Sequence, residues 1–141
     1  MGWLKGRVEI VTGATKGIGG AVSQAFAKEG AAVICAARSA ALVEETAELI
    51  RGEGGRAVAV VADLSTEDGA RQVVERGTEA FGHVDCLINN AGDSGPTKPV
   101  QKYPLDEWRY TIDSCLTSSY LCARFAVPAM IRGGRGTIVN I

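Results

Sequence analysis

Five short apolar runs, rich in β-branched residues, alternate with longer helical patterns along this 141-residue chain. They span residues 7–12, 31–37, 56–61, 84–89 and 136–141. Short apolar runs separated by helical segments are typical of parallel strands that are buried on both faces and joined by helices. We therefore expect an α/β fold built on a doubly wound parallel sheet with the strand order 3-2-1-4-5.

Residues that favour helix ends separate these runs. Ser39 and Gly52 bracket the second predicted helix, and Ser65 followed by Asp68 resembles a capping box for the third. Pro104 precedes two acidic residues and predicts the start of the fourth and longest helix.

The fourth predicted helix carries a long apolar stretch. Pro128 is expected to kink or end this helix, because proline cannot donate to the helical ladder. Residues 116–131, LTSSYLCARFAVPAMI, are apolar enough to pack against a second copy of the chain. Packing inside the chain is the alternative, so a homo-oligomer is expected only for the complete protein.

A glycine-rich segment, TGATKGIG at residues 12–19, follows the first apolar run directly. Without a Cβ at the turn, a pyrophosphate can approach the free N–H groups and the positive end of the next helix. A tight strand-to-helix turn that binds no ligand is the alternative for this segment taken alone.

Two further motifs accompany the glycine segment. Asp63-Leu64 follows the third run, and Asn89-Asn90-Ala91-Gly92 follows the fourth. The TGxxxGxG spacing together with these motifs resembles the short-chain dehydrogenase/reductase family over essentially the whole chain. The resemblance implies a Rossmann-type fold, truncated after the fifth strand, in which residues 1–141 form a single, C-terminally incomplete dinucleotide-binding domain.

By that resemblance, the glycine segment surrounds the pyrophosphate, the Asp-Leu pair meets the adenine, and the Asn-Ala-Gly motif lines the ribose and nicotinamide. Asn89 is expected to tie neighbouring strands together, since a buried amide needs partners. The implied coenzyme-binding residues are Gly13, Thr15, Lys16, Gly17, Ile18, Gly19, Arg38, Asp63, Leu64, Asn90, Ala91 and Gly92.

The residues after the second run favour NADP(H) over NAD(H). An acidic residue there would bind the ribose 2′-hydroxyl and repel a 2′-phosphate, but this chain has Ala37. Arg38 follows, and Lys16 lies in the glycine segment, so both can form charge-assisted hydrogen bonds with phosphate oxygens. The alternative is that both are ordinary solvated charges.

The resemblance implies reduction of a carbonyl or oxidation of an alcohol, using a serine and a YxxxK motif that lie beyond a segment like residues 136–141. None of the three tyrosines has a lysine four positions later. We therefore expect no catalytic residue within the chain, and no activity from these 141 residues alone. Cys115 takes the place of a helix asparagine that completes a proton relay in the family.

Two alternative functions remain open. One is a non-catalytic NADP(H)-binding or interaction protein derived from this fold, and the other is a subunit whose site is completed by a second polypeptide. Glu9 also departs from the family pattern, because it places a carboxylate in a strand that is normally apolar.

Composition narrows the partners. A net charge of −1 and scattered basic residues argue against nucleic acid and anionic membranes. No apolar run approaches the roughly 20 residues that span a bilayer, and no signal peptide is evident, so a cytoplasmic location is expected.

The four cysteines form no CxxC pair and are expected to be free structural thiols, with no metal site. His83 is expected to be a surface turn residue.

Overall fold

The computed structural model describes residues 2–141 and contains a five-stranded parallel sheet in the predicted order, β3-β2-β1-β4-β5. The strands are β1 (Val8–Thr12), β2 (Ala32–Ala37), β3 (Arg56–Val61), β4 (Cys86–Asn89) and β5 (Thr137–Asn140). The helices are α1 (Gly17–Lys28), α2 (Ala40–Gly52), α3 (Glu67–Phe81), α4 (Leu105–Ile112) and α5 (Ser118–Gly133). A 3-10 turn, η1 (Val100–Lys102), and a π-helical turn, η2 (Asp113–Thr117), complete the order.

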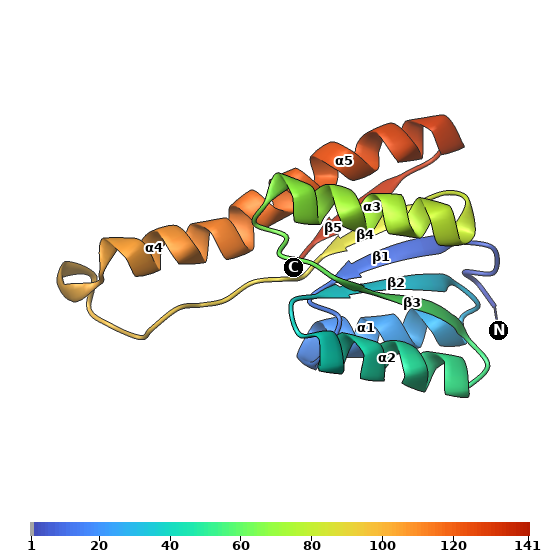
Figure 1. Cartoon of the computed structure of the whole chain (residues 1–141), viewed down its shortest axis with the longest axis horizontal. Helices are drawn as coiled ribbons and strands as arrows, with labels where there is room; N and C mark the ends of the chain where they lie inside the picture. The colour runs from blue at the N-terminus through green and yellow to red at the C-terminus, as the bar shows by residue number, and fades with distance from the viewer. Residues whose placement is uncertain (1) are drawn as a thin grey trace.

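Helices cover both faces of the sheet. Figure 1 shows α1 and α2 on one face and α3 and α5 on the other. Side chains of β1 alternate between the two cores: Val8 and Ile10 pack with residues of α3 and α5, whereas Val11 packs with residues of α2. This doubly wound arrangement confirms the α/β prediction.

The prediction that all five strands are buried on both faces is wrong for the sheet edges. Every residue of β5 is exposed, and β3 is buried at only two of its positions. The central strands β1, β2 and β4 are buried almost throughout. The difference follows from position, because β3 and β5 are the two edge strands and lack a further strand and its covering helix on their outer side, which leaves their side chains less enclosed.

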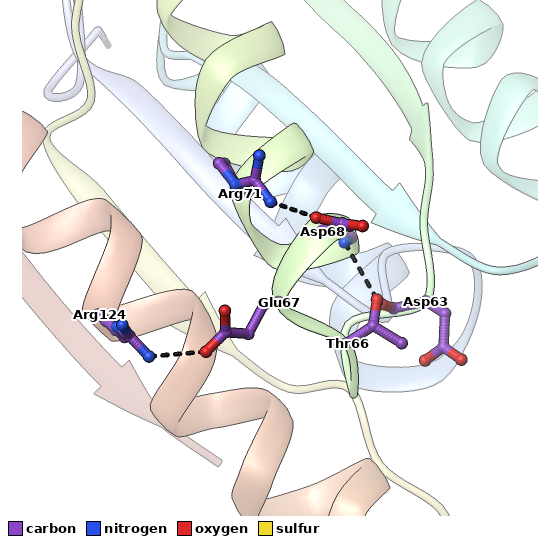
Figure 2. Close-up of polar contacts among 7 residues, drawn as sticks. Asp63, Thr66, Glu67, Asp68, Arg71 and Arg124 are labelled. Carbon is purple, nitrogen blue, oxygen red and sulfur yellow. Dashed lines mark hydrogen bonds and ion pairs between the residues drawn. The ribbon is translucent and has the colours of Figure 1, made fainter.

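The predicted start and end of the second helix are confirmed, but the third helix begins differently. Ser39 caps α2, which ends at Gly52. For α3 the cap is Thr66, whose hydroxyl accepts a hydrogen bond of 3.1 Å from Gly69 N–H (Figure 2). The cap that the sequence predicts, Ser65, is wrong, because its hydroxyl donates to the carboxylate of Asp63 at 2.6 Å.

A salt bridge links the start of α3 to α5. Figure 2 shows Glu67 and Arg124 pointing toward one another from these two helices, with 2.8 Å between Oε1 and Nη1. Both side chains are at least half exposed, so the pair contributes roughly 1 kcal/mol or less. The apolar contacts between the two helices supply most of their association.

The segment that forms α4, η2 and α5 is continuous. It begins after Pro104, as predicted, and α4 projects away from the sheet (Figure 1). Pro128 does not end the helix, since α5 continues to Gly133. Ala129 and Met130 pack into the core beyond this proline, which stabilises the last turns of the helix. Sequence reasoning did not predict the π-helical turn η2.

Buried polar groups fasten β5 to the sheet. Asp85 is 2% exposed and accepts hydrogen bonds from Arg135 Nε at 2.5 Å and from Val8 N–H at 2.9 Å. Burial acts to raise the pKa of Asp85, but these hydrogen bonds outweigh it and hold the pKa below its usual value. His83, partly exposed in the preceding turn, places Nε2 3.0 Å from the same carboxylate.

Asn89 confirms its predicted role between strands. Its side-chain amide donates to Asn140 Oδ1 at 2.9 Å, which joins the ends of β4 and β5. The same amide lies 3.4 Å from the carbonyl oxygen of Ser119 in α5.

All four cysteines are free thiols. Cys35, Cys86 and Cys122 are buried, and Cys115 is exposed. Within residues 2–141, no cluster of three or more His, Cys, Asp or Glu side chains is placed to hold a metal ion. None of the helices in this described range combines the length and apolar character needed to cross a membrane.

Glu9 is the second residue of β1 and is 3% exposed. Burial is the largest influence on its carboxyl group and raises its pKa, while a hydrogen bond with the thiol of Cys86 acts in the opposite direction. Cys86 is the register partner of Glu9 on β4. Burial and the carboxylate of Glu9 together raise the pKa of the Cys86 thiol to about 12, so the thiol stays protonated and can donate.

Replacing Glu9 with Gln is expected to raise the free energy of unfolding at pH 7 by about 1 kcal/mol, because a buried charge is removed. The pKa of Glu9 is raised in the folded state, so its buried charge destabilises the fold to the full extent above that pKa. The cost vanishes below the unfolded-state pKa of about 4.3. Urea unfolding at pH 7 and pH 4 should therefore show that the gain in stability is smaller at the lower pH.

The matched variant Glu75→Gln, at an exposed site on α3, should change stability little at either pH. An equal gain at both pH values would contradict this account.

Candidate functional site

A cleft of about 830 Å³ opens at the carboxyl ends of the strands, beside the point where the strand order reverses between β1 and β4. Ten of the twelve predicted binding residues line it, although they come from four separate loops. They are Gly13, Thr15, Lys16, Gly17, Arg38, Asp63, Leu64, Asn90, Ala91 and Gly92. Ile18 and Gly19 belong to the same turn but lie outside this lining.

The glycine turn has the backbone shape that the sequence predicts. Gly13 and Gly17 have φ values of +63° and +54°, a region that L side chains rarely adopt. A Cβ on Gly17 would meet nothing within 4 Å, so it is the backbone conformation and not crowding that favours glycine there. A Cβ on Gly19 would lie 2.2 Å from the carbonyl oxygen of Gly13, so the turn and the helix pack too closely for any side chain there.

Helix α1 begins at this turn and leaves donors for a ligand. Lys16 is its N-cap residue and supplies no side-chain acceptor. The first turn of the helix also lacks an acidic residue. Its first N–H groups and its positive dipole end therefore remain available to an anion in the cleft. These features fit the approach of a pyrophosphate.

Hydrogen bonds from Thr12 and Asn90 lock the glycine turn to the loop after β4. The buried hydroxyl of Thr12 accepts from the backbone N–H groups of Asn90 and Ala91, both at 2.9 Å, and donates to the carbonyl of Ile88. The side-chain amide of Asn90 donates in return to the carbonyl oxygens of Thr12 and Gly13. Two walls of the cleft thus form one unit. The sequence predicts a ligand contact for Asn90, and the structure adds this structural role.

The wall after β2 carries the predicted basic residue. Arg38 donates a hydrogen bond of 2.7 Å from Nη1 to the hydroxyl of Tyr110 on α4. This hydrogen bond raises the pKa of the Arg38 guanidinium. Lys16 lines the same cleft from the glycine turn, so both predicted cations face one space.

The wall after β3 contains Asp63 and Leu64. Hydrogen bonds from the Ser65 hydroxyl and N–H hold the pKa of the Asp63 carboxyl below its usual value. Leu64 is buried beneath the cleft, packed in the core on the α3 side of the sheet. A charged acceptor and an apolar surface therefore lie side by side, a combination suited to a nucleobase.

Cys115 lies in the π-helical turn η2, beside the loop after β4. Its thiol donates to the carbonyl oxygen of Asp93 at 3.4 Å, and its sulfur would be 3.0 Å from a Cβ placed on Gly92. The structure thus places Cys115 next to the predicted nicotinamide side. The predicted effect on a proton relay stays a prediction.

Sequence reasoning missed several residues of the cleft. Half of those that it did not single out come from α4, η2 and α5, and no local pattern signals that these elements reach the cleft. Apart from Ala37, which the sequence analysis had singled out, the additional lining residues are Ser39, Leu42, Ala62, Ser65, Tyr110, Asp113, Ser114 and Ser118.

Comparison with known proteins places this geometry in context. The family model described as short chain dehydrogenase matches residues 7–141. Glucose 1-dehydrogenase 2 of Bacillus subtilis is 36% identical over 140 residues, which cover 98% of this chain and 54% of the relative. The chain thus spans about half the length of the curated relatives it matches.

Two similar solved structures contain nicotinamide coenzymes. A metagenomic short-chain oxidoreductase in complex with NADP has a TM-score of 0.91 and 35% identity, and the match covers 97% of this chain and 62% of that one. A 7α-hydroxysteroid dehydrogenase complexed with NADH and 7-oxo glycochenodeoxycholic acid has a TM-score of 0.92 and 31% identity, with coverage of 98% and 53%. The neighbours therefore include both coenzymes.

Replacing Thr12 with Val is expected to lower the free energy of unfolding by about 1–3 kcal/mol. Valine preserves the volume but leaves the N–H groups of Asn90 and Ala91 without their acceptor. Chemical denaturation measures the loss. Thr46→Val is the matched control, because the Thr46 hydroxyl donates to the carbonyl of Leu42 within its own helix and accepts from no backbone N–H among the described residues. Equal losses in the two variants would show that the lock contributes nothing special.

Replacing Gly19 with Ala is expected to destabilise the chain by about 1–3 kcal/mol, since the new methyl group collides with backbone that cannot easily move. Gly52→Ala provides the comparison, because a Cβ at Gly52 meets nothing within 4 Å. That change should be neutral or stabilise by up to about 1 kcal/mol. Thermal unfolding of both variants tests the contrast, and a harmless Gly19→Ala would refute the close packing.

Proposed function

The chain belongs to the short-chain dehydrogenase family, and from that premise we propose that it binds NADP(H) as the coenzyme of an oxidoreductase. The reaction would be hydride transfer that reduces a carbonyl or oxidises an alcohol. We further propose that these 141 residues supply the coenzyme-binding residues and are inactive alone, since none of their tyrosines belongs to a YxxxK motif.

One observation carries the choice of NADP(H). Arg38 and Lys16 line the same cleft, and Ala37 stands where an acidic residue would select NAD(H). The 2′-phosphate is the group that distinguishes the two coenzymes, and a guanidinium binds phosphate through charge-assisted hydrogen bonds. The presence of both NADP and NADH among similar structures makes this local chemistry the deciding argument.

The other predicted residues would bind the remaining parts of the coenzyme. Gly13, Gly17 and the start of α1, with Ile18 and Gly19, would surround the pyrophosphate through backbone N–H groups. Asp63 and Leu64 would contact the adenine. Thr15 would contribute from the glycine turn, and residues 90–92 would meet the ribose and nicotinamide. When bound, the coenzyme would supply or accept the hydride.

The substrate and partners follow from the family at a coarser level. We propose a small-molecule alcohol or carbonyl compound as substrate, a homo-oligomer as the complete enzyme, and a cytoplasmic location.

Arg38→Ala is expected to weaken NADPH binding about tenfold or more, because a charge-assisted contact to phosphate is lost. NADH affinity should change less than about twofold. Fluorescence titration of the purified chain with each coenzyme measures both constants. The control is Arg132→Ala, at an exposed arginine in the last turn of α5.

Equal loss of NADPH and NADH affinity in Arg38→Ala would refute the assignment of the 2′-phosphate to Arg38. Assaying carbonyl reduction in the same samples tests the second part of the proposal. Turnover by the 141-residue chain would show that the catalytic group lies within it after all.

A further inference from the structure

Arg38 is held from a distant part of the chain. Its Nη1 lies 2.7 Å from the hydroxyl of Tyr110, which is 72 residues later on α4. The guanidinium carbon also lies 5.8 Å from the centroid of the Tyr110 ring, within the range of a cation–π contact. Tyr110 itself lines the cleft. Two contacts of different kinds therefore orient one side chain at the cleft wall.

The hydroxyl of Tyr110 is itself oriented. It lies 3.5 Å from Oδ2 of Asp93, as a long hydrogen-bond donor, while it accepts from Arg38. Because its proton points toward Asp93, its lone pairs face the guanidinium. The other carboxylate oxygen of Asp93 accepts from the N–H of Gly95 at 2.9 Å, which fixes the carboxylate in place.

The acidic groups near Arg38 are occupied by other partners. Asp63 Oδ1 accepts from both the N–H and the hydroxyl of Ser65, and Asp93 bonds to Gly95 and Tyr110. Both carboxylates act on Arg38 through electrostatics. The direct acceptor of Arg38 is the hydroxyl of Tyr110 and not a carboxylate, so the guanidinium is oriented without a direct ion pair and remains available to a ligand.

We propose that Tyr110 is a positioning residue that sets the preference for NADP(H) by holding Arg38 ready for the 2′-phosphate. This inference rests on the proposed function. Arginine carries five N–H donors, so the bond from Nη1 to Tyr110 leaves donors on Nε and Nη2 for phosphate oxygens. An exposed arginine otherwise loses side-chain entropy when it binds, and restraint by Tyr110 removes part of that cost before the coenzyme arrives.

The test is Tyr110→Phe, which keeps the ring and removes the hydroxyl. The dissociation constant for NADPH is expected to rise about 3- to 10-fold, while that for NADH stays within about twofold. Tyr110→Leu also removes the ring face and should raise the NADPH constant further. Fluorescence titration measures both coenzymes, and circular dichroism checks that each variant is folded.

Two controls separate this role from a general effect on structure. Tyr120→Phe removes a hydroxyl from an exposed tyrosine of α5 that does not line the cleft, and should leave both constants unchanged. In the double variant Arg38→Ala/Tyr110→Phe, loss of the Tyr110 hydroxyl should cost nothing beyond the effect of Arg38→Ala, because the two residues act as one unit.

The remaining outcomes each overturn the proposal. Equal weakening of NADPH and NADH would mean that Tyr110 supports the cleft in general, and tighter NADPH binding would mean that it competes with the phosphate for Arg38. If Arg38→Ala weakens NADPH binding and Tyr110→Phe does not, only the role of Tyr110 fails. If the wild-type chain shows no preference for NADPH, both the role of Tyr110 and the proposed function fail.

Discussion

The buried hydroxyl of Thr12 holds together the two loops on which the cleft depends. Thr12 is the last residue of β1, the central strand, and its hydroxyl accepts hydrogen bonds from the N–H groups of Asn90 and Ala91, which follow β4. Asn90 returns two hydrogen bonds to the carbonyls of Thr12 and Gly13. Because the glycine turn starts at Gly13, these hydrogen bonds set its position relative to the loop after β4.

Charged groups are used differently at the two ends of the sheet. At the amino ends of the strands, the buried carboxylate of Asp85 binds Arg135 and the N–H of Val8, and its role there is structural. At the carboxyl ends, Lys16 and Arg38 face a cleft. Parallel strands direct their helix N-termini to this same end, so the positive dipole of α1 adds to these cations. An anionic ligand is favoured at one end only.

Tyr110 extends the site beyond the Rossmann-type core. It lies on α4, which projects from the sheet in Figure 1, yet it reaches back to Arg38 after β2 and to Asp93 after β4. A single phenol thereby links the wall that would bind the 2′-phosphate to the loop that continues past Gly92. Selectivity between coenzymes would then depend on how this helix is placed as well as on the residue after β2.

The sequence by itself determined the alternation of strands and helices, from which right-handed crossovers and a reversal beside the first strand give the sheet order. It also determined the glycine turn and much of the cleft lining, because these depend on local features: turn positions that favour glycine and side chains at strand ends. Other features were decided by tertiary structure alone. Helix α5 continues through Pro128 because Ala129 and Met130, which follow it, are held in the core. The Thr12–Asn90 exchange and the Arg38–Tyr110 bond join residues more than 70 positions apart, and such distances carry no signal in the local sequence. Only folding brings those atoms within hydrogen-bonding range.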